Sequence, residues 1–293
     1  MLRQRLIAAT ALLALAGCGA GAKRHAAADP PPAQADPPAA ASCPQAGASE
    51  VDGGHLRMPA GARPGSTPLI VVLVPGGRSD RSDRLGVGAA ATKRGFAVLY
   101  PTSDDIFWAL NHDQGDGDVD AVTGLLDRTL AGGCFDARRL SITGVSNGAG
   151  FAARMACALP ERFAAVVPVA AGYRALDPCP RTARASFLDI HGTADTVVPY
   201  NGKKPDRAGS VPRHAAAWAR RDGCAARPAQ TTPRRLVTRV RYRGCDAGLR
   251  VERLRLSGTD HGWPGAGPPL PDRNPSGLSA TRELLRFVAT AQR

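Results

Sequence analysis

Long apolar runs are almost absent from this sequence of 293 residues: only residues 6–17 form one. No other stretch nears the roughly 20 residues that a membrane-spanning helix needs, which excludes a polytopic membrane protein. Aromatic residues are scarce at 5%, and no basic stripe is interleaved with them. The net charge of +13, mostly scattered arginine, therefore indicates a solvated surface and argues against a nucleic-acid partner. The apolar fraction of 43% excludes a disordered chain.

The first eighteen residues predict export. A short basic head, Met1–Arg5, precedes the apolar stretch Leu6–Ala16, which is too short for a permanent membrane span. The stretch ends in Leu15-Ala16-Gly17-Cys18, which resembles the lipobox of bacterial lipoproteins. We therefore expect residues 1–17 to be a signal peptide and Cys18 to carry the lipid that anchors the protein to a membrane. An ordinary secretory signal, cut after a triplet of small residues, is the alternative, and it also exports the protein.

A tether is predicted over residues 18–42. Most of this segment is Gly, Ala, Pro, Asp and Gln, with proline runs such as Asp29-Pro30-Pro31-Pro32. Such a composition cannot bury enough apolar surface to offset its ordering entropy, and the prolines favour an extended spacer. Residues 43–293, about 250 in number, have the length of one large α/β domain.

Cysteine usage agrees with export. With Cys18 set aside, six of the seven cysteines remain, an even number that allows up to three disulfides in fifteen possible pairings. Buried free thiols are the alternative, and export disfavours them. No Cys-x-x-Cys or histidine-rich spacing suggests a zinc site. The six residues are Cys43, Cys134, Cys157, Cys179, Cys224 and Cys245.

Strand-like and helix-like segments alternate along residues 43–293. Continuous apolar, β-branched runs are typical of strands buried on both faces of a parallel sheet. They occupy residues 69–74, 96–100, 140–143, 165–169 and 187–190. Strand then helix, repeated, predicts a doubly wound, mostly parallel α/β sheet flanked by helices. Helices are expected at 119–130, 149–159, 212–220 and 279–290, the last with Ser279 as N-cap, and two paired strands at 237–242 and 251–256 with Cys245 in their turn.

A Gly-x-Ser-x-Gly pattern, Gly144-Val145-Ser146-Asn147-Gly148, follows the strand at 140–143 and precedes a helix. The pattern is weak by itself in a glycine-rich chain, but its position is that of a nucleophile elbow. There the strand turns sharply into the helix and holds the serine in a strained conformation, so the residues two before and two after it must be small. Ser146 is therefore the candidate nucleophile, and the helix N-terminus lends positive potential to a developing oxyanion.

An acid and a base follow Ser146 along the chain. Asp195 lies in the loop after a late strand, where an Asx turn with Val197 is the alternative role for it. His261 lies after the last strand and is the only histidine C-terminal to both residues except His214, which falls inside a predicted helix. The order Ser146, Asp195, His261 is the order of the triad in α/β hydrolases.

With these motifs the sequence resembles the family of polyhydroxybutyrate depolymerases and feruloyl or acetylxylan esterases, a family with bacterial lipoproteins among its members. The Asn after the nucleophile and the His-x-Trp-Pro-Gly run separate this family from lipases, peptidases and dienelactone hydrolases. The resemblance implies an α/β-hydrolase fold and serine esterase activity. It extends over about residues 65–293, and its matching stretches are Asp118–Asp120, Arg138–Gly148, His191–Asp195, Gly223-Cys224, His261–Gly265 and the final helix.

The resemblance also implies a mechanism. Ser146 would attack an ester carbonyl while His261 removes its proton and Asp195 orients the imidazolium; the alcohol leaves first, and water then releases the acid. No cofactor or metal is needed. The acidic cluster within residues 113–120 lacks the EF-hand spacing and is expected to be a solvated helix start. A hydrolase fold used only for binding in the envelope is the rival interpretation, and an intact triad argues against it.

The oxyanion hole is the point where this chain departs from the family. Backbone N–H groups of Asn147 and Gly77 are the expected donors. The family usually has His-Gly where this chain has Pro75-Gly76, so a shift of one residue would make Gly76 the second donor. Pro75 has no N–H and cannot donate, but the backbone character of the hole is retained.

Three disulfides are expected in the folded domain. The first resembles a bridge in the family, between a helix end and the turn before the last strand. The second closes the unit formed by the nucleophile helix and the next strand, and the third follows by exclusion. In that order, the pairs are Cys224–Cys245, Cys157–Cys179 and Cys43–Cys134.

The substrate is the least determined feature. We expect no appended module that could grip an insoluble polymer, so the expected substrates are short, acetyl or hydroxycinnamoyl esters of carbohydrates. We also expect a monomer. Poly(3-hydroxybutyrate) or its oligomers are the alternative. Trp108, in the loop after the strand at 96–100, is expected to line the acyl or sugar site, and Trp263 is a second candidate for stacking, with core packing as its other role.

Overall fold

The computed structural model describes residues 42–75, 83–103, 105–173, 179–202, 209–266 and 273–293. Ala40–Arg293 forms one compact unit, to which these residues belong. The predicted signal peptide at 1–17, the lipidation site Cys18 and all but the last residue of the tether lie outside the described residues. No helix of the described ranges is long and apolar enough to cross a membrane.

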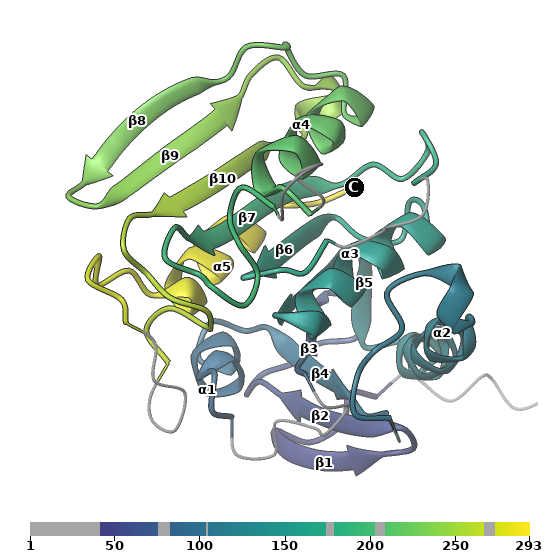
Figure 1. Cartoon of the computed structure of the whole chain (residues 1–293). Coiled ribbons are helices and arrows are strands. Elements are labelled where there is room, and N and C mark those ends of the chain that lie inside the picture. The colour runs from purple at the N-terminus through teal and green to yellow at the C-terminus, as the bar shows by residue number, and fades with distance from the viewer. Residues whose placement is uncertain (1–41, 76–82, 104, 174–178, 203–208, 267–272) are drawn as a thin grey trace, which may run out of the picture. The chain divides into compact units, whose positions relative to one another are not determined.

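A ten-stranded sheet runs through the described part of this unit (Figure 1). Its strands are β1 (Gly47–Val51), β2 (Gly54–Met58), β3 (Thr67–Leu73), β4 (Ala97–Pro101), β5 (Phe135–Val145), β6 (Ala165–Val169), β7 (Ser186–Gly192), β8 (Ala229–Arg234), β9 (Val237–Tyr242) and β10 (Val251–Leu256). Their spatial order is β1-β2-β4-β3-β5-β6-β7-β10-β9-β8. The six strands from β4 to β10 in this order are parallel, and the two at each edge pair antiparallel. The predicted doubly wound, mostly parallel sheet is confirmed.

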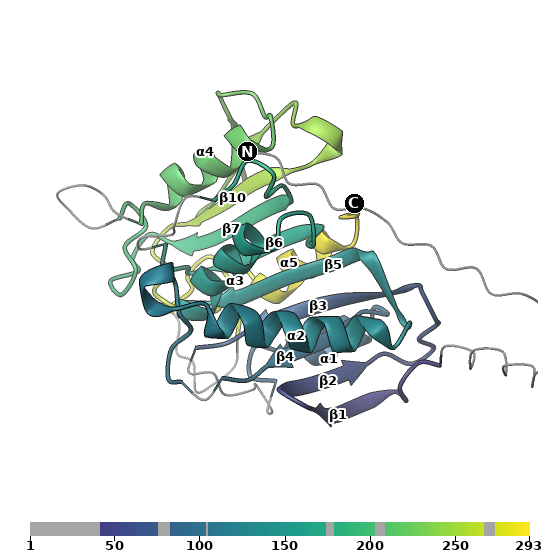
Figure 2. The same ribbon diagram turned by 90° about the vertical axis from the view of Figure 1, so that its right-hand side faces the viewer.

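Helices cover both faces of the sheet, which explains the continuous apolar strands. The helices are α1 (Val87–Thr92), α2 (Gly117–Ala131), α3 (Asn147–Ala158), α4 (Val211–Arg221) and α5 (Ala280–Val288), with short 3-10 turns at His112–Gln114 and Asp246–Gly248. Figure 2 shows α2, α3 and α4 on one face and α1 and α5 on the other. In β3, Leu69 and Val71 pack into the core under α2 and α3, whereas Ile70 and Val72 pack under α1 and α5. Every position of such a strand is therefore buried.

The sequence predicted the central elements and missed those at the edges. The expected helices and strands are present with shifted ends, and the Ser279 hydroxyl caps α5 by accepting from the Arg282 N–H at 3.3 Å. The missed elements are β1, β2, β8 and α1. Strands β1 and β8 are largely exposed, so they carry no buried apolar run, and α1 has only 6 residues, too few for a helical period.

All three predicted disulfides are present. One links Cys43 at the start of the described chain to Cys134, directly before β5. The second links α3 to the segment before β7 through Cys157 and Cys179, and the third links the chain after α4 to the β9–β10 turn through Cys224 and Cys245. The second bridge starts inside α3, whereas the other two join segments that lie next to or between elements.

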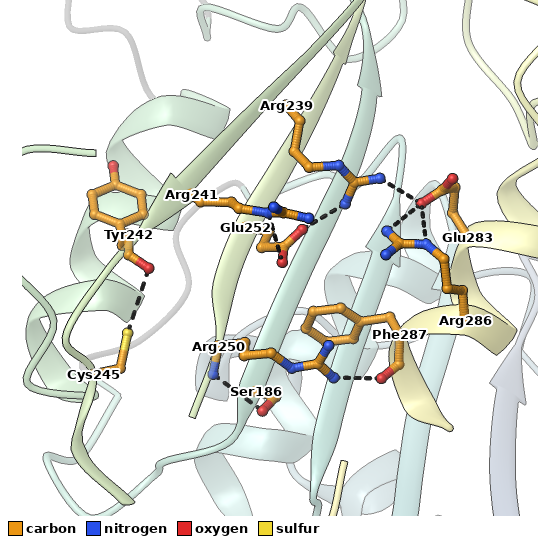
Figure 3. A network of polar contacts seen from close by, with 10 residues as sticks. All are labelled: Ser186, Arg239, Arg241, Tyr242, Cys245, Arg250, Glu252, Glu283, Arg286 and Phe287. Atoms are coloured by element: carbon orange, nitrogen blue, oxygen red, sulfur yellow. Dashed lines mark hydrogen bonds and ion pairs between the residues drawn. The ribbon is translucent and has the colours of Figure 1, made fainter. Parts of the chain in front are cut away.

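An ion network that the sequence did not reveal fastens β9 and β10 to α5 (Figure 3). Arg239 of β9 donates to Glu252 of β10 at 2.5 Å and to Glu283 of α5 at 2.6 Å. Arg241 lies 3.2 Å from Glu252, and Arg286 donates to Glu283 at 2.7 Å. Because Arg239 and Glu252 are both buried, the last antiparallel strands are held to the helix by paired charge.

Candidate active site

Ser146 lies at a sharp turn between β5 and α3, in the strained conformation that the sequence predicted. Its φ is 57°, in the region that residues other than glycine rarely adopt. A Cβ atom at Gly144 would lie 2.5 Å from the Leu73 carbonyl oxygen of β3 and 2.6 Å from the Gly148 carbonyl oxygen. A Cβ atom at Gly148 would also collide with the Leu73 carbonyl. The two glycines are thus required by the approach of β3 as well as of α3.

The structure brings the three residues of the expected triad together. The Nε2 atom of His261 lies 2.8 Å from the Ser146 Oγ, and its Nδ1 atom lies 2.8 Å from Oδ2 of Asp195. Ser146 follows β5, Asp195 follows β7 and His261 follows β10, so all three lie at the carboxyl ends of parallel strands. The side chain of Asp195 is fully buried, whereas that of His261 is 20% exposed. This arrangement can pass a proton from the serine to the histidine.

Asp195 fulfils both of the roles that the sequence allowed. Its Oδ1 atom accepts hydrogen bonds from the Val197 N–H at 3.0 Å and the Val198 N–H at 2.7 Å, as in an Asx turn. Its Oδ2 atom remains for His261. Burial by itself would raise the pKa of Asp195, but hydrogen bonds from His191, His261 and the Val198 N–H hold that pKa well below its usual range. The carboxylate is therefore ionised wherever the protein is folded near neutrality.

His214, the other histidine downstream of Ser146 and Asp195, is a core residue. It lies inside α4, as predicted, with its ring stacked on Tyr173 at 3.8 Å between centroids. Burial, with a smaller contribution from the Arg221 charge, lowers the pKa of His214 to about 3. A neutral ring packed in this way takes no part in the hydrogen bonds of Ser146.

The expected oxyanion donors are partly described. Asn147 is the first residue of α3, where backbone N–H groups have no partner within the helix. Gly77 and Gly76 lie outside the described residues. The Asn147 side chain forms two bonds to Trp108: its Oδ1 accepts from the Trp108 N–H at 2.8 Å, and its Nδ2 donates to the Trp108 carbonyl at 2.9 Å.

Trp108 is buried in the core, whereas the sequence predicted that it would line the acyl or sugar site. Its side chain is 1% exposed and stacks on Phe151 at 4.9 Å between centroids. The indole is drawn inward because its Nε1–H donates to the carbonyl of Val74 at 2.8 Å, a buried acceptor. Trp108 thereby joins the residue after the nucleophile, Asn147, to the residue before Pro75, where the second oxyanion segment begins.

A pocket of about 230 Å³ opens beside Ser146 and His261. Trp263 lines it, although that side chain is otherwise buried and donates its Nε1–H to the Thr281 Oγ1 at 2.9 Å. Both roles considered for Trp263, core packing and contact with the site, are thus present. The lining is mainly apolar with one guanidinium, and its other members are Val74, Pro75, Arg84, Leu85, Val145 and Gly262.

Exposed apolar side chains flank the triad. In the described part of the chain, the large apolar residues that stay exposed are Ile106 at 75%, Phe107 at 64% and Val197 at 60%. Ile106 and Phe107 directly precede Trp108, which binds Asn147, and the Val197 N–H binds Asp195.

The acidic cluster of residues 113–120, at the start of α2, binds the chain directly after Trp108. Asp118 accepts a hydrogen bond from the Ala109 N–H at 2.7 Å, and Asp116 pairs with Arg154 of α3 at 2.5 Å. Asp113 and Asp116 are exposed, in keeping with the solvated helix start that the sequence predicted. Among the described residues, no group of three or more His, Cys, Asp or Glu is arranged to hold a metal ion.

Two side chains that contact the site residues were not singled out from the sequence for the part they play. His191 was quoted only as part of a motif, yet it lies within 3.2 Å of Asp195. Trp108 was expected at the site, but as a surface for substrate and not as a link between Asn147 and Val74. The partners of Trp108 are distant in the chain, so only the folded structure identifies them, whereas His191 contacts Asp195 and Val198 of its own motif.

Comparisons with known sequences agree with the geometry. Residues 54–174 match the model of the family described as Esterase PHB depolymerase. The protein named "Putative esterase NocK", from Nocardia uniformis subsp. tsuyamanensis, is 28% identical over 271 residues, which cover 81% of this chain and 76% of that protein. Feruloyl esterase B from Piromyces equi is 27% identical over 155 residues, which cover 49% of this chain and 28% of that protein.

Solved structures give the fold. An acetyl xylan esterase from Aspergillus awamori superposes with a TM-score of 0.54 at 16% identity, over 81% of this chain and 94% of the other. A thermostable esterase gives a TM-score of 0.51 at 17% identity, over 82% and 59%. The predicted α/β-hydrolase fold is confirmed. With the sequence matches, the comparisons confirm the family resemblance that the motifs indicated and support a carboxylic ester hydrolase.

Proposed function

We propose that this chain is a serine esterase whose nucleophile, base and acid are Ser146, His261 and Asp195. The observation that carries the proposal is the unbroken line of two hydrogen bonds, each 2.8 Å, from the Ser146 hydroxyl through His261 to the Asp195 carboxylate. A serine hydroxyl is a weak nucleophile until a base removes its proton, and the imidazole is oriented for that step by the carboxylate.

The reaction proceeds in two halves. Ser146 Oγ attacks the ester carbonyl as its proton passes to His261, and the tetrahedral oxyanion is stabilised by the Asn147 N–H and by an N–H of Gly77 or Gly76. The oxyanion collapses, the alcohol leaves with the proton from His261, and an acyl-enzyme remains. Water then gives a proton to His261 and attacks the acyl carbonyl, which releases the acid and restores Ser146.

The pocket supports a small acyl group. At about 230 Å³ it is below the roughly 300–1,000 Å³ of ordinary ligand pockets, and its lining is mainly apolar. We propose esters of carbohydrates as substrates: the pocket supports acetyl or other short acyl groups, and hydroxycinnamoyl groups are proposed from the name of the feruloyl esterase that resembles the chain. The stacking contact first expected of Trp108 passes to its exposed neighbour, Phe107.

A second candidate is hydrolysis of poly(3-hydroxybutyrate) or its oligomers. The observation that favours it is the exposed apolar set Ile106, Phe107 and Val197, which could contact a polyester as well as a phenolic ring. The two candidates predict different effects on substrate use when the side chain of Phe107 is removed. We expect Phe107→Ala to raise KM for methyl ferulate several-fold and to leave p-nitrophenyl acetate turnover nearly unchanged. Preference for hydroxybutyrate oligomers, in wild type and variant alike, would favour the depolymerase.

Turnover of p-nitrophenyl acetate by the purified domain tests the esterase proposal. Wild type should hydrolyse the ester, and Ser146→Ala should not, with an unchanged melting temperature. A wild type inactive on every short ester would contradict the proposal and favour an envelope binding protein with a hydrolase fold. Equal activity in Ser146→Ala would assign the chemistry to another residue.

Export and membrane anchoring are also proposed. They are supported by the Leu15-Ala16-Gly17-Cys18 run and by the three disulfides, since disulfides persist in oxidising compartments. Cys18→Ser should move the protein from the membrane fraction to a soluble exported fraction. Unchanged fractionation would contradict the anchor, and a soluble wild type would favour an ordinary secretory signal.

A further inference from the structure

Asp195 is contacted by a second histidine that the proposed mechanism does not use. His191 lies in β7, four residues before Asp195, and is fully buried. Its Nε2 atom is 2.9 Å from the Val198 carbonyl oxygen and 3.2 Å from Oδ2 of Asp195. The same Oδ2 atom lies 2.8 Å from Nδ1 of His261. One carboxylate oxygen therefore faces two imidazole rings.

We propose that His191 is a positioning residue of the triad: its Nε2–H group, bonded to the Val198 carbonyl, lies against the Asp195 carboxylate and withdraws negative charge from the oxygen that orients His261. The proposal rests on the esterase function above. His191, the first residue of the His191–Asp195 motif, would thereby influence how strongly the triad base, His261, holds its proton.

The contacts determine which nitrogen of His191 carries a proton. A carbonyl oxygen only accepts, so the 2.9 Å contact with Val198 requires a hydrogen on Nε2. The same nitrogen lies 3.2 Å from Oδ2 of Asp195, so the positive end of this N–H group is close to the carboxylate whatever the state of Nδ1. The loop closes on itself, because the Val198 N–H donates to the other oxygen of Asp195 at 2.7 Å. His191, Val198 and Asp195 thus form one cycle that fixes the carboxylate.

The surroundings of His191 keep the ring in place. Its Nδ1 atom faces Oδ1 of Asp189 at 3.9 Å, and the other Asp189 oxygen accepts from the Tyr173 hydroxyl. The edge of the ring meets Tyr200 at 6.0 Å between centroids. The neighbouring strand β10 contributes two arginines. In the parallel register Arg253 is opposite Asp189, and Arg255 is opposite His191.

The charge state of this buried group agrees with a donor role. Burial raises the pKa of Asp189. Burial by itself would lower the pKa of His191, but the contact with Asp195 and the charge of Asp189 outweigh burial, so the pKa of His191 is raised. Whatever the state of Nδ1, which lies 3.9 Å from Asp189, the Nε2–H group stays bonded to Val198 and close to Asp195. A donor on the Asp195 carboxylate reduces the attraction that it exerts on the His261 proton.

The position also explains why the effect should appear in kcat. His191 is not among the described residues that line the pocket beside Ser146, so its loss removes no substrate contact in that part of the chain. It acts only through Asp195, and a carboxylate released by one donor orients His261 less well. A small misplacement of catalytic groups costs up to about 100-fold in rate.

Donor-free and donor-retaining variants test the proposal. His191→Phe keeps a ring and removes the donor, His191→Leu removes it with a smaller side chain, and His191→Gln retains an N–H. On p-nitrophenyl acetate we expect the donor-free variants to lower kcat about 10- to 100-fold with KM changed less than about twofold. The acid limb of their kcat/KM profile should move to higher pH, because His261 holds its proton more tightly. His191→Gln should recover part of both effects.

A second measurement does not depend on turnover. In the Ser146→Ala background, the imidazole nitrogens labelled with ¹⁵N should show His261 titrating at higher pH in His191→Phe or His191→Leu than with His191 present. Unmoved titration and an unmoved acid limb in folded variants would overturn the proposal, as would equal loss of kcat in His191→Gln and His191→Phe. Failure of the esterase proposal appears elsewhere, as an inactive wild type or an active Ser146→Ala.

Discussion

Two buried polar clusters lie on one sheet, the triad at the carboxyl ends of β5, β7 and β10, and the ion network that joins β9 and β10 to α5 (Figure 3). The triad residues stand in loops just after strands, and His261 stays 20% exposed beside a pocket. The network residues come from within elements, and the side chains of Arg239 and Glu252 are each 8% exposed. The reactive histidine is left open on one side, whereas the central pair of the network, Arg239 and Glu252, is enclosed.

The electrostatics differ in the same way. Burial would lower the pKa of Arg239, but the hydrogen bonds from its guanidinium to Glu283 and Glu252 raise it, so the cation stays charged. Removing one carboxylate there leaves a buried cation with only one of its two carboxylate partners. In the triad, by contrast, Asp195 has donors from Val197, Val198 and His191 in addition to His261. Loss of His261 therefore removes a reaction and not the pairing of a buried charge.

The largest expected effect follows from that difference. His261→Gln should lower kcat/KM for p-nitrophenyl acetate by a factor on the order of 10⁴ or more, because no other base reaches Ser146 in the described residues. The free energy of unfolding should change by less than about 1 kcal/mol, since the side chain is partly exposed. Steady-state kinetics and urea unfolding of the same preparation check both. If His261→Gln cost more unfolding free energy than transition-state stabilisation, the contrast between the triad and the ion network would be contradicted.

Breaking the ion network should have the opposite signature. Glu252→Gln keeps the shape of the side chain but removes the charge that Arg239 faces at 2.5 Å, and we expect a loss of about 3 kcal/mol of unfolding free energy. Turnover per folded molecule should stay within about twofold of wild type, because Glu252 lies near the start of β10 and His261 follows its end. The unfolding midpoint and an active-site titration measure the two quantities. A folded Glu252→Gln protein with greatly reduced kcat would show that the network acts on the triad.

A third test concerns the neutral histidine of α4. His214 has a pKa of about 3 in the folded protein, against an ordinary value of 6.5. Between these values the unfolded chain takes up a proton that the folded protein does not, so stability falls as the pH drops below 6.5. Phe at this position keeps the stack on Tyr173 and does not titrate. From pH 7 to pH 5, His214→Phe should therefore lose about 2 kcal/mol less unfolding free energy than wild type, and parallel pH curves would contradict it.

The triad could be predicted from the sequence because its chemistry restricts residue types locally. The elbow needs glycines at 144 and 148, the base must follow the acid, and each lies directly after a strand. Five of the six central strands were predictable for a similar reason, since burial on both faces leaves a continuous apolar run; β10 carries charged residues and was predicted as one of two paired strands. These signals come from neighbours in the chain, and a single sequence contains them.

The ion network and the role of Trp108 could not be predicted in this way. Arg239 and Glu252 lie in strands that also carry exposed arginines, and the contact of Arg239 with Glu283 of α5 joins residues 44 positions apart. Trp108 was expected in the correct loop, yet its indole is directed by Val74, 34 residues earlier in the chain. Contacts of this range leave no spacing pattern, so sequence analysis gave the location of Trp108 without its orientation.

The smallest expected effect separates burial from charge within the network itself. Arg286 donates to the same Oε2 atom of Glu283 as Arg239, at 2.7 Å, but its side chain is 47% exposed. Water already solvates this guanidinium, and Glu283 keeps its bond to Arg239 when Arg286 is removed. Arg286→Ala should therefore cost less than about 1 kcal/mol, and 0.5 M salt should reduce that cost further. A urea unfolding series of Arg286→Ala beside Glu252→Gln measures the ratio of the two losses; equal losses would mean that the number of ion pairs, and not their burial, determines what this network contributes.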